Sequence, residues 1–239
     1  MLIRIKHSPT PWLLAIFLLG LVWTSPGQES IDKQDTNPLS ERMAEEAEAI
    51  LKNLKSTTYQ HKTEIRPDIG SYKLDCSGLV VHITKIISPD HLKCIPIEEG
   101  KPRARAFAFY DVFNDIAHGD TTYPGWSAVP KLADARRGDV IVWRKPNLVA
   151  GQNSGHVMII AESPIEEPDH SFRMVVYDST TILHDNDSRK SGTTGVGKGT
   201  MWFKANADGT PSEYRRNSHS KFHSDPIAIG RMTKILNPK

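Results

Sequence analysis

Hydrophobic and polar positions divide the chain into three kinds of pattern. An unbroken apolar run, Trp12 to Trp23, follows the basic residues Arg4 and Lys6. Apolar side chains then recur every three or four residues over 41–54, 77–87 and 106–117, which is typical of helices with one buried face. Beyond residue 139 the pattern changes to short runs rich in β-branched and aromatic residues. Helices first and strands afterwards predict an α+β domain whose N-terminal helices pack on an antiparallel β-sheet.

The predicted helices and strands have recognisable ends. Ser40 is a candidate N-cap of the first helix, Pro89 ends the second, and Gly119 ends the third. A loop is expected over 56–73. The predicted strands cover 140–144, 156–162, 172–178, 199–205 and 226–232.

The N-terminal apolar run predicts a signal peptide. Its twelve residues are too few to cross a membrane comfortably, but they fit the apolar region of an export signal. Ser25 and Gly27 form a small-x-small cleavage site, so we assign 1–27 to the signal, 28–38 to a linker and 39–239 to one folded domain. An uncleaved anchor is the alternative. We expect an exported protein of the periplasm or cell exterior that meets the membrane only through this segment.

Charge argues against a nucleic-acid partner. The chain has 30 basic and 28 acidic residues, and cleavage after Gly27 removes two basic ones, leaving a formally neutral protein. No basic stripe remains. With 38% hydrophobic residues the composition is that of an ordinary globular protein. We expect a monomer without a cofactor or a metal.

The stretch DCSGLV, residues 75–80, contains one of the two cysteines. Asp75 is a good N-cap, which makes Cys76 the first residue of the second helix, where the positive end of the helix dipole favours a thiolate. Export favours a competing interpretation, a disulfide between Cys76 and Cys94. The helix from Cys76 to Ile87 would be about 18 Å long, so this bridge would need the chain to fold back sharply.

A base and an orienting group follow on the predicted strands. His156 begins the run HVMII after the flexible stretch GQNSG, where its ring can face the start of a helix. Asp178 ends the run MVVYD. If these two strands are antiparallel neighbours, Asp178 can hydrogen-bond the far nitrogen of His156. Each residue also has an alternative interpretation without a catalytic role. His156 would be a hydrogen-bonded histidine at the end of a strand, and Asp178 an aspartate that caps a turn.

Together these residues resemble the NlpC family of papain-like cysteine peptidases, bacterial enzymes that cut peptidoglycan stem peptides. The resemblance rests on Tyr59, DCSGLV, RGDV at 137–140, GHV at 155–157 and then Asp178, in that order. It spans about residues 40 to 180 and implies a papain-like fold. It differs from the family in having an aspartate where the third position is commonly histidine, and in a long tail from 179 to 239.

The resemblance also implies residue roles. Cys76 would be the nucleophile, His156 the base and Asp178 the orienting residue, and the backbone N–H of Cys76 would help to form an oxyanion hole. Tyr59, Asp75 and Ser77 would hold the free amine of the substrate. The partners would be peptidoglycan stem peptides or related peptides, cut between D-glutamate and the diamino acid through a thioester.

Other interpretations stay open at this stage. A catalytically silent wall-binding module with Cys76 in a disulfide, a wall amidase and an acyltransferase are alternatives. Trp126, after Pro124-Gly125, is a candidate for the substrate groove. His219, His223 and Asp225 form a weak zinc pattern. The glycine-rich stretch 192–200 lacks the spacing of a phosphate loop and is interpreted as a mobile loop.

Overall fold

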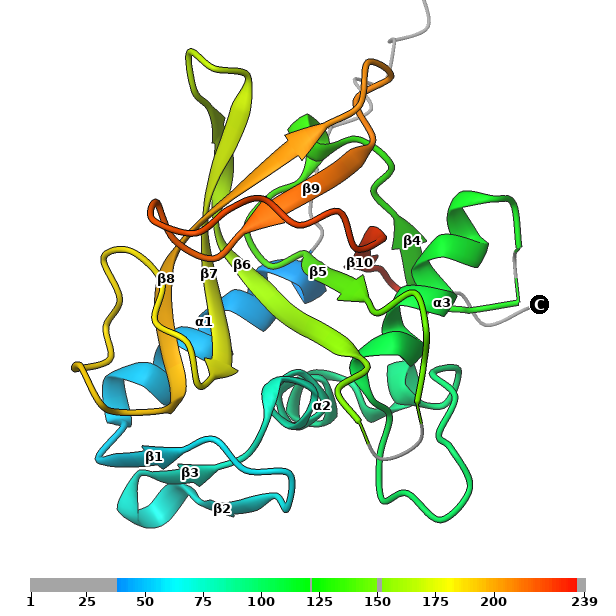
Figure 1. Cartoon of the computed structure of the whole chain (residues 1–239). Helices are drawn as coiled ribbons and strands as arrows, with labels where there is room; N and C mark the ends of the chain where they lie inside the picture. The colour runs from blue at the N-terminus through cyan, green and yellow to red at the C-terminus, as the bar shows by residue number, and fades with distance from the viewer. Residues whose placement is uncertain (1–37, 121, 150–151, 236–239) are drawn as a thin grey trace, which may run out of the picture. The chain divides into compact units, whose positions relative to one another are not determined.

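The computed structural model of the chain describes residues 38–120, 122–149 and 152–235. It is an α+β structure with few helices and a large antiparallel sheet, which confirms the predicted class (Figure 1). The predicted signal peptide lies outside the described residues. The helices are α1 (Pro38–Asn53), α2 (Cys76–Ile87) and α3 (Ala106–Ala117), with short 3₁₀ helices η1 (Pro67–Ile69), η2 (Pro89–Leu92) and η3 (Leu132–Asp134).

The strands form two sheets. In the described residues, the large sheet has seven strands in the order β4-β10-β5-β6-β7-β8-β9, and every neighbouring pair is antiparallel. Its strands are β4 (Trp126–Ala128), β5 (Val140–Arg144), β6 (Gly155–Glu166), β7 (Ser171–Thr180), β8 (Gly195–Ala205), β9 (Pro211–Arg215) and β10 (Ile227–Met232). The small sheet has the order β1-β3-β2, built from β1 (Ser56–Thr58), β2 (Glu64–Arg66) and β3 (Ser71–Lys73).

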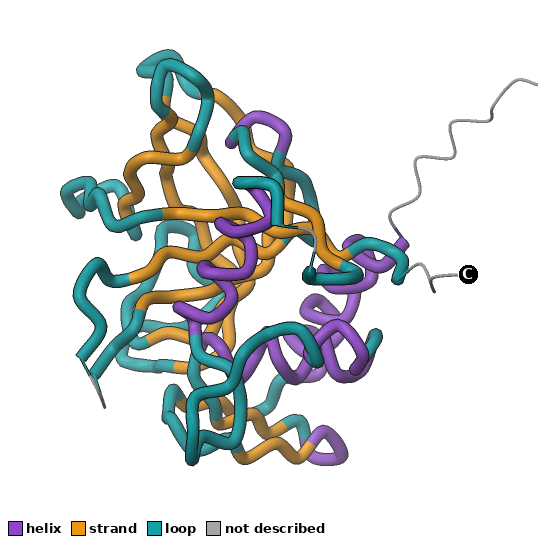
Figure 2. The backbone as a smooth tube through the Cα atoms, turned by 90° about the vertical axis from the view of Figure 1, so that its right-hand side faces the viewer, coloured by secondary structure: helices purple, strands orange, loops and turns teal. Residues whose placement is uncertain are grey.

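The small sheet is a correction to the sequence interpretation. The segment 56–73, expected to be a loop, contains β1, β2 and β3, each three residues long and too short to show an alternating pattern. The small sheet lies apart from the large one in both views (Figures 1 and 2). It is joined to β8 through Thr57 Oγ1, which accepts a hydrogen bond of 2.7 Å from the Val196 N–H.

Two further boundaries differ from expectation. β8 begins at Gly195, so part of the stretch expected to be a mobile loop is a central strand. α1 begins at Pro38, so Ser40, the predicted N-cap, lies within the first turn, and its hydroxyl donates to the Met232 carbonyl. The predicted ends at Ile87 and Ala117 agree with α2 and α3.

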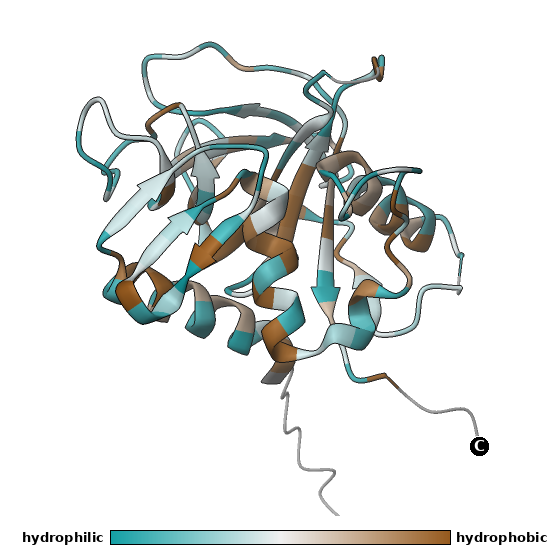
Figure 3. Ribbon diagram, turned by 90° about the horizontal axis from the view of Figure 1, so that it is seen from below, coloured by the Kyte–Doolittle hydropathy of each residue, from teal (hydrophilic) through white to brown (hydrophobic). Residues whose placement is uncertain are grey.

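Both faces of the large sheet are covered. On β5, Val140 and Val142 belong to a core shared with the three α-helices, whereas Ile141 and Trp143 belong to a second core on the opposite face. Figure 3 shows hydrophobic residues concentrated where the helices meet the strands. Burial on both faces explains why these strands read as continuous apolar runs instead of alternating ones.

Two glycines allow the close approaches that position the site. A Cβ on Gly138, which has φ +86°, would lie 1.9 Å from the Ser40 carbonyl oxygen. A Cβ on Gly155, with φ +139°, would lie 2.0 Å from the Trp143 carbonyl oxygen. Only glycine combines a positive φ with so little space, so the glycines of RGDV and GHV are required by the backbone.

Candidate active site

Cys76 begins α2, as the sequence predicted. Asp75 has an extended backbone, and its Oδ1 accepts a hydrogen bond of 2.8 Å from the Gly78 N–H, which makes Asp75 the N-cap. The Cys76 side chain, 5% exposed, therefore lies in the first turn, where unpaired backbone N–H groups create a positive potential.

His156 and Asp178 lie on neighbouring antiparallel strands. Ile159 on β6 pairs with Tyr177 on β7, so His156 and Asp178 share the other face of the sheet. Nε2 of His156 lies 2.7 Å from Oδ2 of Asp178, which is the contact expected from the sequence. The Cys76 sulfur lies close enough to the imidazole to raise its pKa, and because Nε2 contacts Asp178, Nδ1 is the ring nitrogen left for the sulfur.

The electrostatics favour a protonated His156. Burial acts to lower the pKa of the imidazole, but the Cys76 sulfur and the Asp178 carboxylate outweigh burial and raise this pKa to about 9. At neutral pH the ring is then an imidazolium beside the Cys76 sulfur. The Trp143 ring packs against it, with ring centroids 5.0 Å apart, and shields one side from water.

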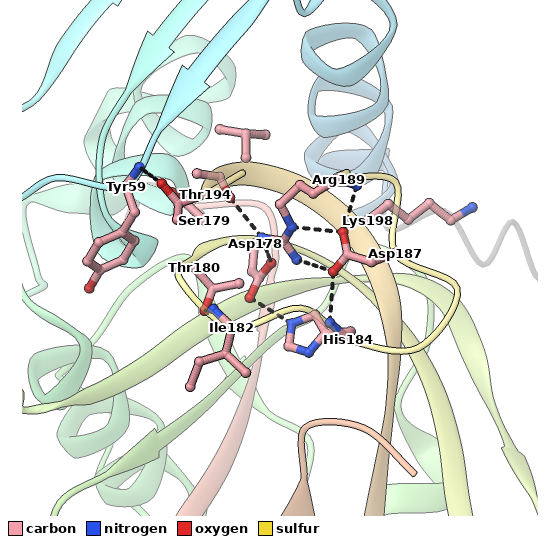
Figure 4. A network of polar contacts seen from close by, with 12 residues as sticks. Tyr59, Asp178, Ser179, Thr180, Ile182, His184, Asp187, Arg189, Thr194 and Lys198 are labelled. Carbon is pink, nitrogen blue, oxygen red and sulfur yellow. Dashed lines mark hydrogen bonds and ion pairs between the residues drawn. The ribbon is translucent and has the colours of Figure 1, made fainter. Parts of the chain in front are cut away.

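Asp178 has further partners that the sequence did not reveal. It is fully buried, with His184 Nε2 3.0 Å from Oδ2 and Arg189 Nη1 3.0 Å from Oδ1 (Figure 4). Burial acts to raise the pKa of Asp178, but His184, His156 and Arg189 together hold it far below the ordinary range. Both partners lie in the loop between β7 and β8, where no periodic pattern marks them.

Asp75 forms the centre of a second polar cluster. Its Oδ1 lies 2.7 Å from Arg103 Nη2, and its Oδ2 lies 3.2 Å from His61 Nδ1. The Ser77 hydroxyl donates to Asp75 Oδ1 and accepts from Arg103. Burial acts to raise the pKa of Asp75, but the guanidinium of Arg103 outweighs it and lowers the pKa. Arg103 and His61 were not predicted, since they lie in segments with no motif.

A cavity of about 240 Å³ opens at Cys76. Four sequence-predicted residues line it together: Tyr59, Asp75, Cys76 and Ser77. Arg103, Lys101 and Arg105 add three cationic side chains, and Gln152, Asn153 and Ser154 lead to His156. Burial, followed by the charges at Cys76 and Asp75, raises the pKa of the Tyr59 phenol, so this group stays protonated and able to donate a hydrogen bond.

Trp126 lies elsewhere. Its side chain is 5% exposed, its Nε1 donates to the His91 carbonyl, and its ring packs on Phe113 in the core. It does not line the cavity. The structure therefore places Trp126 in the core and not at the groove expected from the sequence.

The remaining candidates are held by structural contacts. Cys76 and Cys94 are both free thiols, and Cys94 Sγ contacts the His91 carbonyl, so the alternative disulfide is not formed. Asp225 accepts from Lys145 and Tyr214. Among the described residues no group of three or more His, Cys, Asp or Glu side chains could hold a metal ion.

The sequence was compared with family models and with curated proteins. No family model matches the chain, and no curated protein matches its sequence. In the part of the chain that the structure describes, no helix is both long and apolar enough to span a membrane. The case for a function therefore rests on the residues and their geometry.

Proposed function

We propose that this protein is an exported cysteine hydrolase with an NlpC-type, papain-like fold that cleaves amide bonds in peptidoglycan stem peptides. One observation carries the proposal. A cysteine at the first position of a helix, lining an open cavity, lies beside a histidine whose pKa it raises, and Nε2 of this histidine contacts a buried aspartate. These contacts match the roles of nucleophile, base and orienting group.

The chemistry follows from these positions. The Cys76 thiolate attacks the amide carbonyl carbon, and the Cys76 backbone N–H, in the first turn of the helix, stabilises the resulting oxyanion. The His156 imidazolium gives its proton to the departing amine, leaving a thioester on Cys76. A water molecule then attacks the thioester, loses a proton to His156 and releases the carboxylic acid product. Asp178 holds the ring in position throughout.

The cavity fits an anionic peptide with a free amine. Asp75 offers a carboxylate close to Cys76, which suits an ammonium group at the start of the substrate. Arg103 and Arg105 are paired with carboxylates of the protein, Asp75 and Glu98. The exposed Lys101 supplies positive charge that suits the carboxylates of glutamate and diamino acid residues. We therefore propose the bond between D-glutamate and the diamino acid as the one cut, in agreement with the resemblance to the NlpC family.

Digestion of defined muropeptides tests the proposal. The chain without residues 1–27 is incubated with muropeptides of known sequence, and the products are identified by mass spectrometry. We expect cleavage after D-glutamate, and no cleavage by Cys76→Ala. Release at the sugar–peptide amide would identify an amidase, and a product joined to an added amine would identify an acyltransferase. If no substrate is turned over while Cys76 stays unreactive towards thiol reagents, the proposal is wrong.

A further inference from the structure

We propose that His184 is a positioning residue of this site, which acts with Arg189 to hold Asp178 ionised and to aim its Oδ2 at His156. The inference rests on the proposed function, because it describes how the same site is kept in order. It adds His184 and Arg189 to the residues that organise the site, and it gives the glycines of β8 the role of making room for them.

The contacts on Asp178 are closed to water. The side chains of Asp178, His184 and Arg189 are 0%, 1% and 2% exposed. Oδ2 of Asp178 is shared by two imidazoles, at 2.7 Å from His156 and 3.0 Å from His184. A buried carboxylate without such partners would be strongly destabilised, so these residues are what allow Asp178 to carry a charge beside His156.

The geometry around His184 requires two N–H donors. Its Nδ1 lies 2.9 Å from the carbonyl oxygen of Arg216, and its Nε2 faces the Asp178 carboxylate. Both partners are acceptors, whereas a neutral imidazole has only one N–H. The arrangement is therefore satisfied when His184 is an imidazolium and Asp178 is ionised.

With His184 as an imidazolium, the charge of Asp178 is shared among His156, His184 and Arg189, and Arg189 also contacts Asp187. The guanidinium of Arg216 lies farther out, over the Trp143 ring. Removal of the His184 charge would leave one positive charge fewer around Asp178.

The loop between β7 and β8 is built to present these side chains. Asp187 fixes the loop, because its Oδ2 accepts from the His184 N–H at 2.8 Å and its Oδ1 accepts from the Arg189 N–H at 2.8 Å (Figure 4). On β8, a Cβ at Gly199 would lie 2.6 Å from the His184 Cβ, and one at Gly197 would lie 2.5 Å from Arg189 Nε. The glycines of GVGKG thus make room for both residues.

The substitution His184→Gln tests the inference, since glutamine can still donate to Asp178 but carries no charge. We expect an unchanged KM and a kcat roughly 10- to 100-fold lower, because His156 would be misplaced and misplacement of a catalytic group lowers the rate by about this factor. The loss of a positive charge also shifts two pH profiles to higher pH. Iodoacetamide labelling of Cys76 should rise at a higher pH, and kcat should fall at a higher pH. His170→Gln is the matched control, because His170 is an exposed histidine paired with Glu166.

Two measurements keep this test separate from that of the proposed function. Labelling of Cys76 needs no substrate, so identical labelling profiles for His184→Gln and the unaltered protein would overturn the role of His184, whatever the substrate. If His184→Gln does not fold, ¹H–¹⁵N NMR of the unaltered protein decides. Two protonated ring nitrogens on His184 at pH 7 support the inference, and one unprotonated nitrogen overturns it.

Discussion

At the residue scale, one aspartate on each side of Cys76 organises the site. Asp75 caps the helix and binds Arg103, whereas Asp178 holds His156. The sequence indicated both aspartates because each lies next to a recognisable pattern, a helix start or a strand end. It could not indicate Arg103 or His184, since their contacts join segments far apart in the chain and follow no periodicity.

The pKa of His156 predicts the alkaline limit of activity. The proton on the imidazole is held by Cys76 and Asp178, which raise its pKa to about 9. We expect kcat to fall as the pH rises through about 9, because the ring then has no proton for the leaving amine. The measurement is the pH dependence of kcat on a defined muropeptide. A fall centred near pH 6.5, the ordinary value for histidine, would contradict the account.

The substitution Asp75→Asn tests the role of the other carboxylate. Asparagine is also a good N-cap, so helix α2 should still begin at residue 76, while the charge facing the substrate amine is lost. We expect the KM for a muropeptide with a free amine to rise about tenfold or more, which corresponds to the loss of one charged hydrogen bond. N-acetylation of the muropeptide should abolish the difference between the two proteins. A KM equal to that of the unaltered protein would exclude this role.

The same carboxyl group predicts a dependence of stability on pH. Its pKa is lowered from 3.8 by Arg103 against the effect of burial. A lowered pKa stabilises the fold above pH 3.8, and this contribution is lost as the pH falls towards the folded-state value. Between pH 5 and pH 3, the unaltered protein should therefore lose more unfolding free energy in urea than Asp75→Asn does. Equal losses would show that Arg103 and Asp75 do not interact in solution.

At the scale of elements, the helix start and two strands of the sheet define the site. The sequence predicted α2, α3 and β5 closely, because each has a clear apolar pattern, and the two helices also have a stop residue. It missed β1, β2 and β3, whose three-residue strands are too short for any periodicity. The position of β10 between β4 and β5 also could not be read locally, because strand order depends on contacts across the whole sheet.

The substitution Gly155→Ala should disturb the start of β6. A Cβ there would lie 2.0 Å from the Trp143 carbonyl oxygen, so the backbone next to His156 must move. Gly100→Ala is the matched control, because Gly100 also has a positive φ but no atom lies within 4 Å of its added Cβ. We expect Gly155→Ala to lower the free energy of unfolding, measured in urea, by about 2 kcal/mol or more beyond the effect of the control. Equal costs would contradict the packing described here.

At the scale of the molecule, four distant segments meet at one cavity. The small sheet region carries Tyr59, α2 carries Cys76, the segment before α3 carries Lys101, and β6 begins at Gly155, next to His156. The Ser179 hydroxyl, on β7, donates to the Leu74 carbonyl at 2.7 Å, which ties the segment before Asp75 to the large sheet. This assembly explains why short sequence patterns predict Cys76, His156 and Asp178 but not the groove around them.

The charge of the cavity leads to a prediction about substrate affinity. Arg103 is paired with Asp75 and Arg105 with Glu98, while Lys101 is exposed at the rim. We expect Lys101→Ala to raise the KM for carboxylate-bearing stem peptides several-fold at low salt, and less at high salt, where charges are screened. Lys93→Ala is the control, since Lys93 is an exposed lysine outside the cavity. The same KM change with amidated peptides would exclude recognition of carboxylates.

The claim on which everything else depends is that Cys76 is an activated thiolate paired with His156. Alkylation with iodoacetamide between pH 5 and 9, with peptide mass spectrometry, measures this directly. Cys94 serves as an internal control, because burial raises the pKa of its thiol. The account predicts fast labelling of Cys76 well below pH 8, slowed by His156→Ala, while Cys94 stays unlabelled. Labelling of Cys76 no faster than that of Cys94 would contradict it.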